Sequence, residues 1–401
     1  MTAVVEQRLD FRAASQRAGE GDPAWLTPVR ANAANLASEM EWPDSRAERP
    51  WKYYDISGIG LTPETAAAEE HVTCEGLERG ARVSLLADHG TPEADAAAKL
   101  FASVVTPGTD RLTALHYAYT NAGIAVHVPS NAELAAPVRI KRTASGGGLA
   151  TPHTLIITGA NSRVTIVEEF TSDGSNIVAL PVVEVAPGPG SEVRYYAIHN
   201  WGGNTKVFMH QRFAGTQRDA QFQNLQLVLG GEVVKGHLES SLVERGTASE
   251  LLGVGFGVSN EHADFFTLQD HVGPDTRSDL VYKSALKDDA QSVYYGLTRV
   301  GLGAKNADAA QENRNLLLSK TAKADSDPVL EILTSDIIRA SHGATAGPVE
   351  QDQLFYLQAR GIPYKEAEAM LVRAFLEEVF GRVPNEELRQ ELVDRLEEKL
   401  D

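Results

Sequence analysis

The sequence predicts a mainly β protein that folds as a β-solenoid, with helical segments before and after it. Between about residues 80 and 335, short runs of β-branched and aromatic residues alternate with turns rich in Gly, Asn and Asp, as half-buried strands do. From 236 to 291 these runs begin about every 14 residues, which indicates a repeating architecture. No long helical pattern separates them, so parallel strands joined by crossover helices are not expected. A β-sandwich is the alternative fold.

The first 80 residues are expected to form an N-terminal helical region. Thr27 is expected to cap a helix, with Pro28 at the first helical position. Apolar residues recur around it at helical spacing, namely Trp25, Val29, Ala33 and Leu36. The segment Arg49-Pro-Trp-Lys-Tyr-Tyr54 then brings three aromatic residues together, and we expect it to pack onto the larger β body.

The solenoid core is expected at residues 81 to 345 and a C-terminal helical domain at residues 346 to 401. One helix pattern covers 366 to 380 and places five apolar residues near one face: Ala367, Met370, Leu371, Ala374 and Val379. A second pattern follows Pro384 and carries a leucine at every fourth position: Leu388, Leu392, Leu396 and Leu400. That series runs further than a helix pair needs if it only closes the solenoid. Partner binding and plain capping are the two interpretations.

Charge and hydropathy exclude some classes of partner. The chain has 401 residues, with 37 Lys and Arg against 55 Asp and Glu, and a formal net charge of −18. Nucleic-acid binding needs a basic face, and the short cluster Arg139-Ile-Lys-Arg142 is too small to provide one. No segment approaches the roughly 20 apolar residues of a membrane span, and the start is unlike a secretory leader. We therefore expect a cytoplasmic chain that contacts neither nucleic acid nor membrane.

Motifs of common enzymes are absent from the sequence, including GxxxxGK[ST], GxSxG and HExxH. Sites of these kinds are therefore not expected, and no nucleotide is expected to be bound by this chain. The single cysteine, Cys74, excludes an internal disulfide and a set of thiolate ligands, and its polar surroundings are typical of a surface thiol. Four acidic residues fit a carbohydrate-active β-helix enzyme, although solvated turns explain most of them: Asp264, Asp270, Asp275 and Asp279.

The segment SHGATAGPVEQDQLFYLQARGI, residues 341 to 362, is the most specific stretch of the chain. It resembles the C-terminal signature of the SufB/SufD family of iron–sulfur cluster assembly scaffolds. The segments 262–286 (HADFFTLQDHVGPDTRSDLVYKSAL) and 311–319 (QENRNLLLS), together with the RPWKYY motif, also resemble that family. The resemblance is good over about residues 230 to 380 and looser elsewhere.

Within that family the sequence resembles the SufD branch. Gly343 gives His-Gly-Ala-Thr where SufB reads His-Glu-Ala-Thr, and Asn313 stands where SufB carries a cysteine. The lone Cys74 agrees, because a scaffold that assembles a cluster on its own thiolates needs more of them. In one departure, Ala340 stands where many SufD chains have a cysteine two residues before the histidine.

The resemblance implies a right-handed parallel β-helix that acts as a non-catalytic scaffold. It implies that the chain pairs with a SufB paralogue, recruits the SufC ATPase, and shares a nascent iron–sulfur cluster or iron with a partner subunit. A homodimer is possible when the chain is alone. A β-helix carbohydrate-active enzyme and a purely structural homodimeric solenoid are the alternative functions.

The resemblance also indicates site residues. His342 would be an iron or cluster ligand at the SufB interface, for which a neutral imidazole is suited; a histidine hydrogen-bonded within its own turn is the alternative. Strands between about 300 and 345 are expected to meet SufB, with Leu330 and Ile332 in the contact. The C-terminal helices are expected to bind SufC through four apolar anchors: Met370, Leu371, Ala374 and Phe375.

Overall fold

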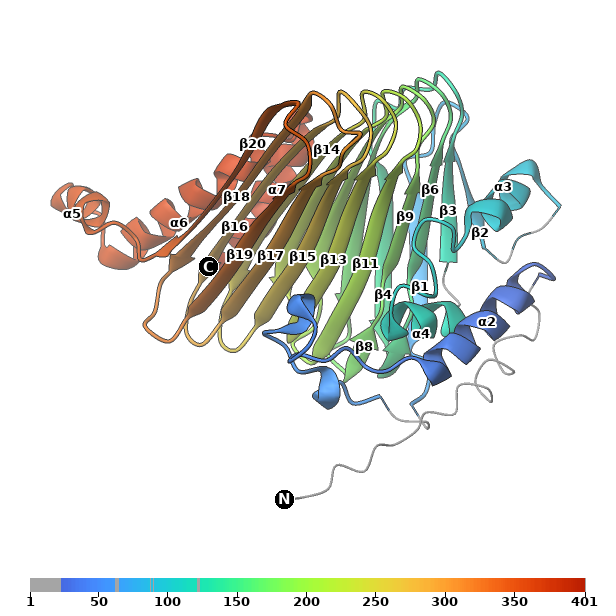
Figure 1. Ribbon diagram of the computed structural model, residues 1–401. Coiled ribbons are helices and arrows are strands. Elements are labelled where there is room, and N and C mark those ends of the chain that lie inside the picture. The colour runs from blue at the N-terminus through green and yellow to red at the C-terminus, as the bar shows by residue number, and fades with distance from the viewer. Residues whose placement is uncertain (1–22, 62–64, 87, 89, 121–122, 401) are drawn as a thin grey trace.

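A flattened solenoid of two facing β-sheets forms the body of the protein, with helices on its outer faces (Figure 1). The computed structural model describes residues 23–61, 65–86, 88, 90–120 and 123–400. The first part of the expected N-terminal helical region, residues 1–22, lies outside these described residues. The mainly β class and the β-solenoid architecture with helices before and after it are confirmed.

Each sheet is a stack of strands whose members come from successive coils. The nine-stranded sheet contains, in spatial order, β1 (Glu69–Glu75), β4 (Val138–Ser145), β7 (Arg163–Ser172), β10 (Glu192–Asn200), β12 (Gln221–Gly230), β14 (Ala248–Gly257), β16 (Arg277–Leu286), β18 (Ala307–Leu317) and β20 (Ile337–Gly347). The eleven-stranded sheet runs in the order β19 (Lys323–Ile332), β17 (Gln291–Val300), β15 (His262–His271), β13 (Val233–Leu242), β11 (Thr205–Gly215), β9 (Val182–Ala186), β6 (His153–Thr158), β3 (Gly123–Val128) and β2 (Arg82–Leu85), with β5 (Gly148–Ala150) and β8 (Ile177–Ala179) beside this path.

Consecutive strands from β11 to β20 alternate between the two sheets, so two strands make one coil. Gln269 on β15 and Thr298 on β17 are paired in register and lie 29 residues apart. The predicted interval of about 14 residues is therefore half a coil. The parallel pairing of neighbouring coils excludes the alternative β-sandwich.

Aromatic rings fill part of the interior between the sheets. Tyr282 on β16 lies against Phe265 and Tyr294, with ring centroids 5.5 and 5.4 Å apart. Glycines of the neighbouring coil leave the room for them, because Gly253 is the register partner of Tyr282 and Gly236 that of Phe265. A Cβ atom on Gly253 would lie 2.3 Å from the Tyr282 ring.

The N-terminal helices cover the outer face of the eleven-stranded sheet. They are α2 (Leu26–Glu39), the short 3-10 helices η1 (Arg49–Trp51) and η2 (Ile56–Gly58), α3 (Pro92–Leu100) and α4 (Arg111–Tyr119). Both α3 and α4 lie within residues 81 to 345. Trp25 is the N-cap of α2, so Thr27 and Pro28 lie in its first turn and the expected cap at Thr27 is wrong. Trp51 stacks on Phe208 of β11, as expected for the aromatic segment.

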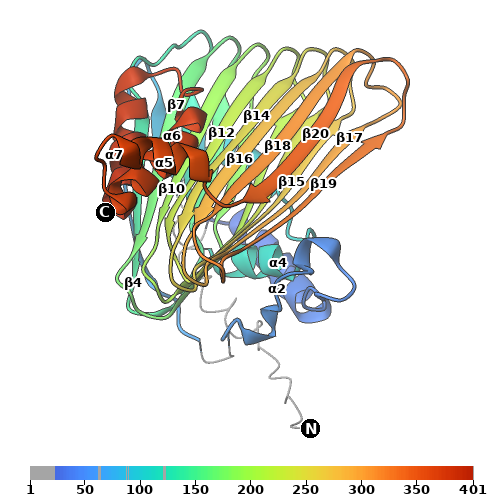
Figure 2. The same cartoon turned by 90° about the vertical axis from the view of Figure 1, so that its left-hand side faces the viewer.

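The C-terminal helices α5 (Gln351–Ala359), α6 (Tyr364–Phe380) and α7 (Glu386–Leu400) lie on the other side, with α6 and α7 packed on the outer face of the nine-stranded sheet (Figure 2). Leu388, Leu392 and Leu396 are buried in one cluster with apolar residues of that sheet. The idea that this leucine series exceeds the needs of packing is therefore wrong. Among the described helices, none is long and apolar enough to span a membrane.

We predict that Gly253→Ala lowers the free energy of unfolding by about 1–3 kcal/mol, because the new methyl group overlaps the Tyr282 ring in a packed interior. Denaturant unfolding monitored by circular dichroism measures the change. The matched control is Gly255→Ala on the same strand, where the added Cβ would meet its nearest neighbour at an ordinary 3.9 Å. Equal stability of the two variants would contradict the proposed interior packing.

Candidate functional site: the open end of the solenoid

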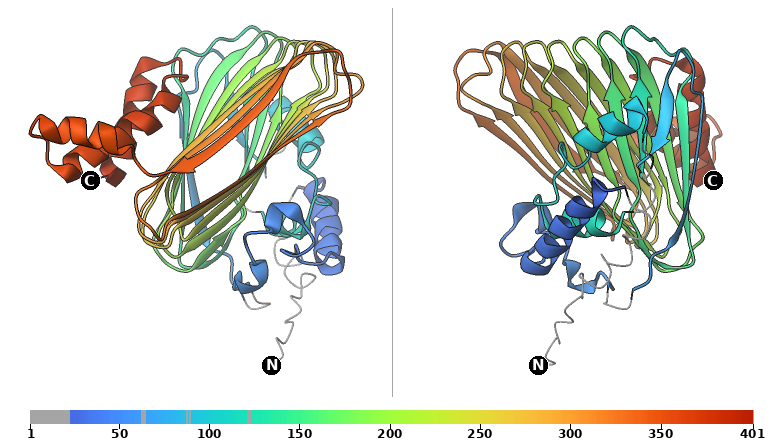
Figure 3. Two further views of the ribbon diagram at one scale, coloured as in Figure 1. Left: turned by 60° about the vertical axis from the view of Figure 1, so that its left-hand side comes forward. Right: turned by 90° about the vertical axis from the view of Figure 1, so that its right-hand side faces the viewer.

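The two ends of the solenoid differ in how their edges are closed. At one end, β1 and β2 pair antiparallel with β4 and β3 and finish the two sheets. At the other end the last strands are β19 and β20, and among the described strands neither has a partner on its outer edge. The left view of Figure 3 looks onto this end, which we call the open end. Such long free edges are templates for pairing with another chain.

His342 lies on β20 and faces the interior of the last coil. Its register partner on β18 is Gln311, which is buried and lies 3.1 Å, Oε1 to Oγ1, from Thr298 of the opposite sheet. Register partners on parallel strands share a face, so the imidazole continues the inward row of Gln311. Because no described coil lies beyond it, His342 is exposed.

Leu330 and Ile332 line the same interior from the opposite sheet. Their register partners on β17 are Thr298 and Val300, both buried. The Thr298–Gln311 contact across the interior is therefore followed, one coil further out, by Leu330 and His342. Leu330 is half-buried, whereas Ile332 is 42% exposed. The structure thus brings three of the residues predicted from the sequence together at the open end.

An apolar rim lies at the turns beside the open end and is not predicted from the sequence. It consists of Leu302 in the turn after β17, Leu333 directly after β19, and Ile338 on β20, which are 76%, 51% and 70% exposed. Large exposed aliphatic side chains at the margin of free strand edges are typical of a protein contact surface. The clustered apolar residues around 330 to 338 carry the sequence signal, but only the coil arrangement places the turn that holds Leu302 next to the last coil.

Neutral polar side chains line the interior beside His342. On β18, the Asn315 Nδ2 atom donates to Asn313 Oδ1 at 2.8 Å, and Ser326 Oγ of β19 donates to the same oxygen at 2.5 Å. The two amide groups are therefore hydrogen-bonded to each other. Among the described residues, no group of three His, Cys, Asp or Glu side chains could hold a metal ion. One imidazole with neutral neighbours needs further ligands from another molecule to hold iron.

Comparison with known proteins decides the family. Residues 140–375 match the family model described as "SUF system FeS cluster assembly, SufBD core domain". The chain belongs to the SufBD family. The iron–sulfur cluster assembly protein SufD of Bacillus subtilis is 27% identical, with 94% of this chain and 95% of that protein covered. A SufBD family iron–sulfur cluster assembly protein of Mycobacterium tuberculosis is 31% identical over 73% of this chain and 75% of its own length.

A SufBD family iron–sulfur cluster assembly protein of Staphylococcus aureus is 27% identical, with 92% of this chain and 88% of that protein covered. These relatives confirm the resemblance stated from the signature at 341 to 362, and within the SufBD family the chain is most like SufD.

Cys74 is not the surface thiol expected from its polar neighbours. It lies on β1 and packs half-buried against the interior core. Burial, followed by the nearby Glu168 carboxylate, raises the pKa of the Cys74 thiol to about 11. A protonated thiol is a poor metal ligand. Moreover, β1 and β20 are the two ends of the nine-stranded sheet, so this thiol is remote from His342.

The four acidic residues of the carbohydrate-enzyme alternative do not form a catalytic pair. Each has its own cation: Asp264 pairs with Lys235, Asp270 with Arg299, Asp275 with Arg245, and Asp279 with Arg382. Only Asp275 lies in a turn, and Asp264 is buried, so the expectation that solvated turns explain most of them is wrong. Four carboxylates that are each held in a separate ion pair give no support to glycoside hydrolysis.

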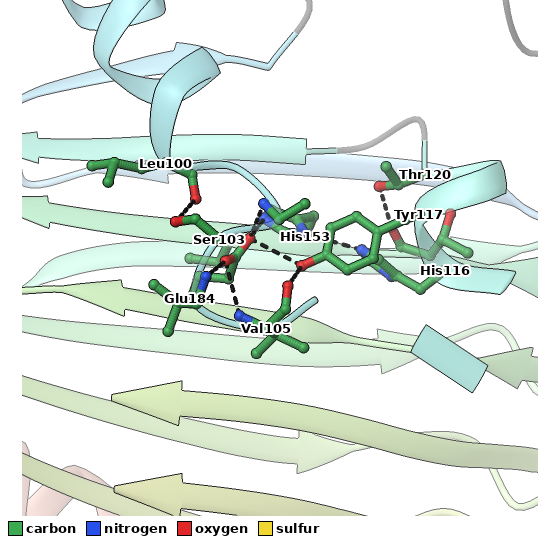
Figure 4. A network of polar contacts seen from close by, with 12 residues as sticks. Leu100, Ser103, Val105, His116, Tyr117, Thr120, His153 and Glu184 are labelled. Carbon is green, nitrogen blue, oxygen red and sulfur yellow. Dashed lines mark hydrogen bonds and ion pairs between the residues drawn. The ribbon is translucent and has the colours of Figure 1, made fainter. Parts of the chain in front are cut away.

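A second cluster of ionisable groups is buried beneath the N-terminal helices (Figure 4). The Glu184 carboxylate accepts hydrogen bonds from the backbone N–H groups of Ala102, Val104 and Val105 at 2.7–3.0 Å. His116 Nε2 lies 3.0 Å from His153 Nδ1, and burial together with His153 keeps the pKa of His116 well below its usual value. These closed contacts fix the segment between α3 and α4 on β9, which gives the cluster a structural role.

Proposed function

We propose that this chain is the SufD-type, non-catalytic scaffold subunit of a cytoplasmic iron–sulfur cluster assembly complex. In this proposal it pairs with a SufB-type paralogue through the open end and recruits the SufC ATPase through its C-terminal helices. The single observation that carries the proposal is the open end itself, where two unpaired strand edges flank an inward-facing, uncovered His342.

Strand addition is the mode of pairing that the open end supports. The outer backbone groups of β19 and β20 lack partners among the described strands, and a paralogue with the same coil geometry can supply them. The apolar rim of Leu302, Leu333 and Ile338 would be buried in the same contact. In the absence of the paralogue, a second copy of this chain could use the same edges.

The iron or nascent cluster is the cargo of this interface. His342 would supply one neutral imidazole ligand from this chain, and the paralogue would supply the thiolates that this chain lacks. The position fits such a role, since a stacked partner coil would come to lie directly over the His342 side of the interior. The surrounding amides offer no competing charge.

The ATPase would dock on the exposed face of α6. Met370 and Ala374, one turn apart, are exposed, whereas Leu371 and Phe375 are half-buried toward the sheet. Phe375 lies 4.6 Å from the buried Lys283 ammonium group. The first two residues would therefore make the direct contact, and the other two would support the helix beneath it.

We predict that His342→Ala lowers the iron retained by the reconstituted complex at least about tenfold, because a direct ligand is lost. Iron content and the visible absorbance of the cluster measure it, with size-exclusion chromatography to confirm assembly. The control is His71→Ala, which removes an exposed histidine on β1 at the opposite end. Unchanged loading in an assembled complex would refute the ligand role.

Ile332→Lys should weaken pairing with the paralogue by about 30-fold or more, since the contact would bury a charge in place of an aliphatic group. Isothermal titration calorimetry measures the dissociation constant. Leu77→Lys is the matched control, because Leu77 is 40% exposed and follows β1 at the closed end. Thermal unfolding of each variant alone should stay close to that of the parent. Native affinity for Ile332→Lys would exclude the open end from the interface.

Ala374→Asp should reduce binding of the ATPase by about tenfold or more while leaving paralogue pairing unchanged, because a charge enters the proposed apolar contact. The identical substitution Ala369→Asp is the control, since Ala369 is exposed on the same helix but points to a different side. Pull-down with purified ATPase, quantified by titration, separates them. Equal binding by the two variants would move the docking site away from this face.

A further inference from the structure

A short N-terminal segment lies on the outer face of the eleven-stranded sheet and contacts its last strand. We call this segment, residues 49–54, the strap; it follows α2 in the blue part of the chain in Figure 1. Together its side chains contact five neighbouring strands, β11, β13, β15, β17 and β19. The strap therefore links the N-terminal layer to the strand that borders the open end.

A buried charge anchors the strap residues Pro50 and Trp51 to the sheet. The Lys235 ammonium group donates to the Pro50 carbonyl at 2.5 Å and lies 4.7 Å from the centre of the Trp51 ring. It also forms an ion pair with Asp264 of β15 at 2.7 Å, and both partners are buried. A buried ion pair is favourable only when further contacts satisfy it. The strap supplies two of these contacts, so Pro50 and Trp51 are firmly held.

Three other strap residues, Arg49, Lys52 and Tyr53, converge on one carboxylate. Asp327 Oδ2 lies 3.3 Å from Arg49 Nη2 and 3.7 Å from Lys52 Nζ, and it accepts a hydrogen bond from the Tyr53 hydroxyl at 3.3 Å. The Arg49 guanidinium group also lies 5.8 Å from the centre of the Tyr295 ring. Two cations and a phenol from the N-terminal region thus meet a residue 274 positions later in the chain.

Asp327 occupies a distinct place in the sheet. A row of register partners along the outer face reads His210, His237, Phe266 and Tyr295, and it ends in Asp327 on β19. The last strand carries three acidic residues on this face, namely Asp325, Asp327 and Glu331. Like charges on one edge strand repel one another, so Arg49 and Lys52 relieve this repulsion where they meet Asp327.

We propose that the strap is a positioning device that holds β19 in place for strand addition at the open end, with Asp327 as the positioning residue. The backbone of β19 has one strand partner, β17, whereas the interior strands have two. Edge strands open locally at low cost, and the strap adds a second tether from outside the sheet. The part of this proposal that concerns a partner rests on the proposed function, whereas the tethering of β19 does not.

Hydrogen exchange of the full-length chain tests the tether directly. In Asp327→Asn, the amides of residues 323–332 should exchange about threefold to tenfold faster, and those of residues 291–300 should not change. The matched control is Asp325→Asn, on the same strand and face but outside the strap contacts. At about 1 M salt the exchange rate of the parent chain should approach that of the Asp327→Asn variant, because the ion pairs are partly exposed and are screened by salt. Equal exchange in both variants would overturn the proposal.

Pairing with the SufB-type paralogue tests the consequence. Asp327→Asn should lower the association rate several-fold relative to Asp325→Asn, because fewer chains present an ordered edge. Faster exchange with an unchanged association rate would overturn the positioning role. If the parent chain does not pair at all, the proposed function fails, and the exchange experiment still decides whether the strap holds β19.

Discussion

The structure depends on one constraint: each strand of a solenoid coil needs the next coil to accept and donate its outer backbone hydrogen bonds. From β4 to β18 and from β3 to β17 that need is met by parallel neighbours. At the start of the stack, the antiparallel strands β1 and β2 also have no strand on their outer edges among the described residues, but these edges are only seven and four residues long and β1 is rich in charged residues. At the other end, β19 and β20 leave it unmet over ten and eleven residues. The proposed interface lies where these backbone hydrogen bonds have no strand partner among the described residues.

The interior explains why the open end carries chemistry as well as hydrogen bonds. Inward positions near that end hold amides, hydroxyls and aromatic rings, so each coil presents polar groups to the next one. Inside the stack these groups satisfy one another, as Thr298 and Gln311 do. The last described coil repeats the pattern with Leu330 and His342, and no described strand lies beyond it. This position, which would be structural one coil earlier, is the reason why His342 is the proposed ligand.

The strand class and its repeat could be predicted because every half-coil has nearly the same length, and the family signature around His342 is local. The face of the sheet on which each side chain lies could not be predicted, because it depends on the strand register with a partner about 29 residues away. That is why Asp264 is predicted to be a turn residue although it is buried with Lys235. The leucines of α7 were misread for the same reason, since their partners lie on sheet strands far away in the sequence.

The two helical layers are attached to opposite outer faces, and each attachment uses a buried lysine. Lys235 holds the strap, and Lys283 on β16 holds α6 by donating to the Phe375 carbonyl at 3.2 Å and to Glu378 at 2.6 Å. Detaching either layer would break these hydrogen bonds, and Lys235 would keep only its ion pair with Asp264 of the sheet. The helices are therefore fixed to the sheets rather than hinged. Because β16 is two strands from β20 in the same sheet, the attachment of α6 lies near the strand that carries His342.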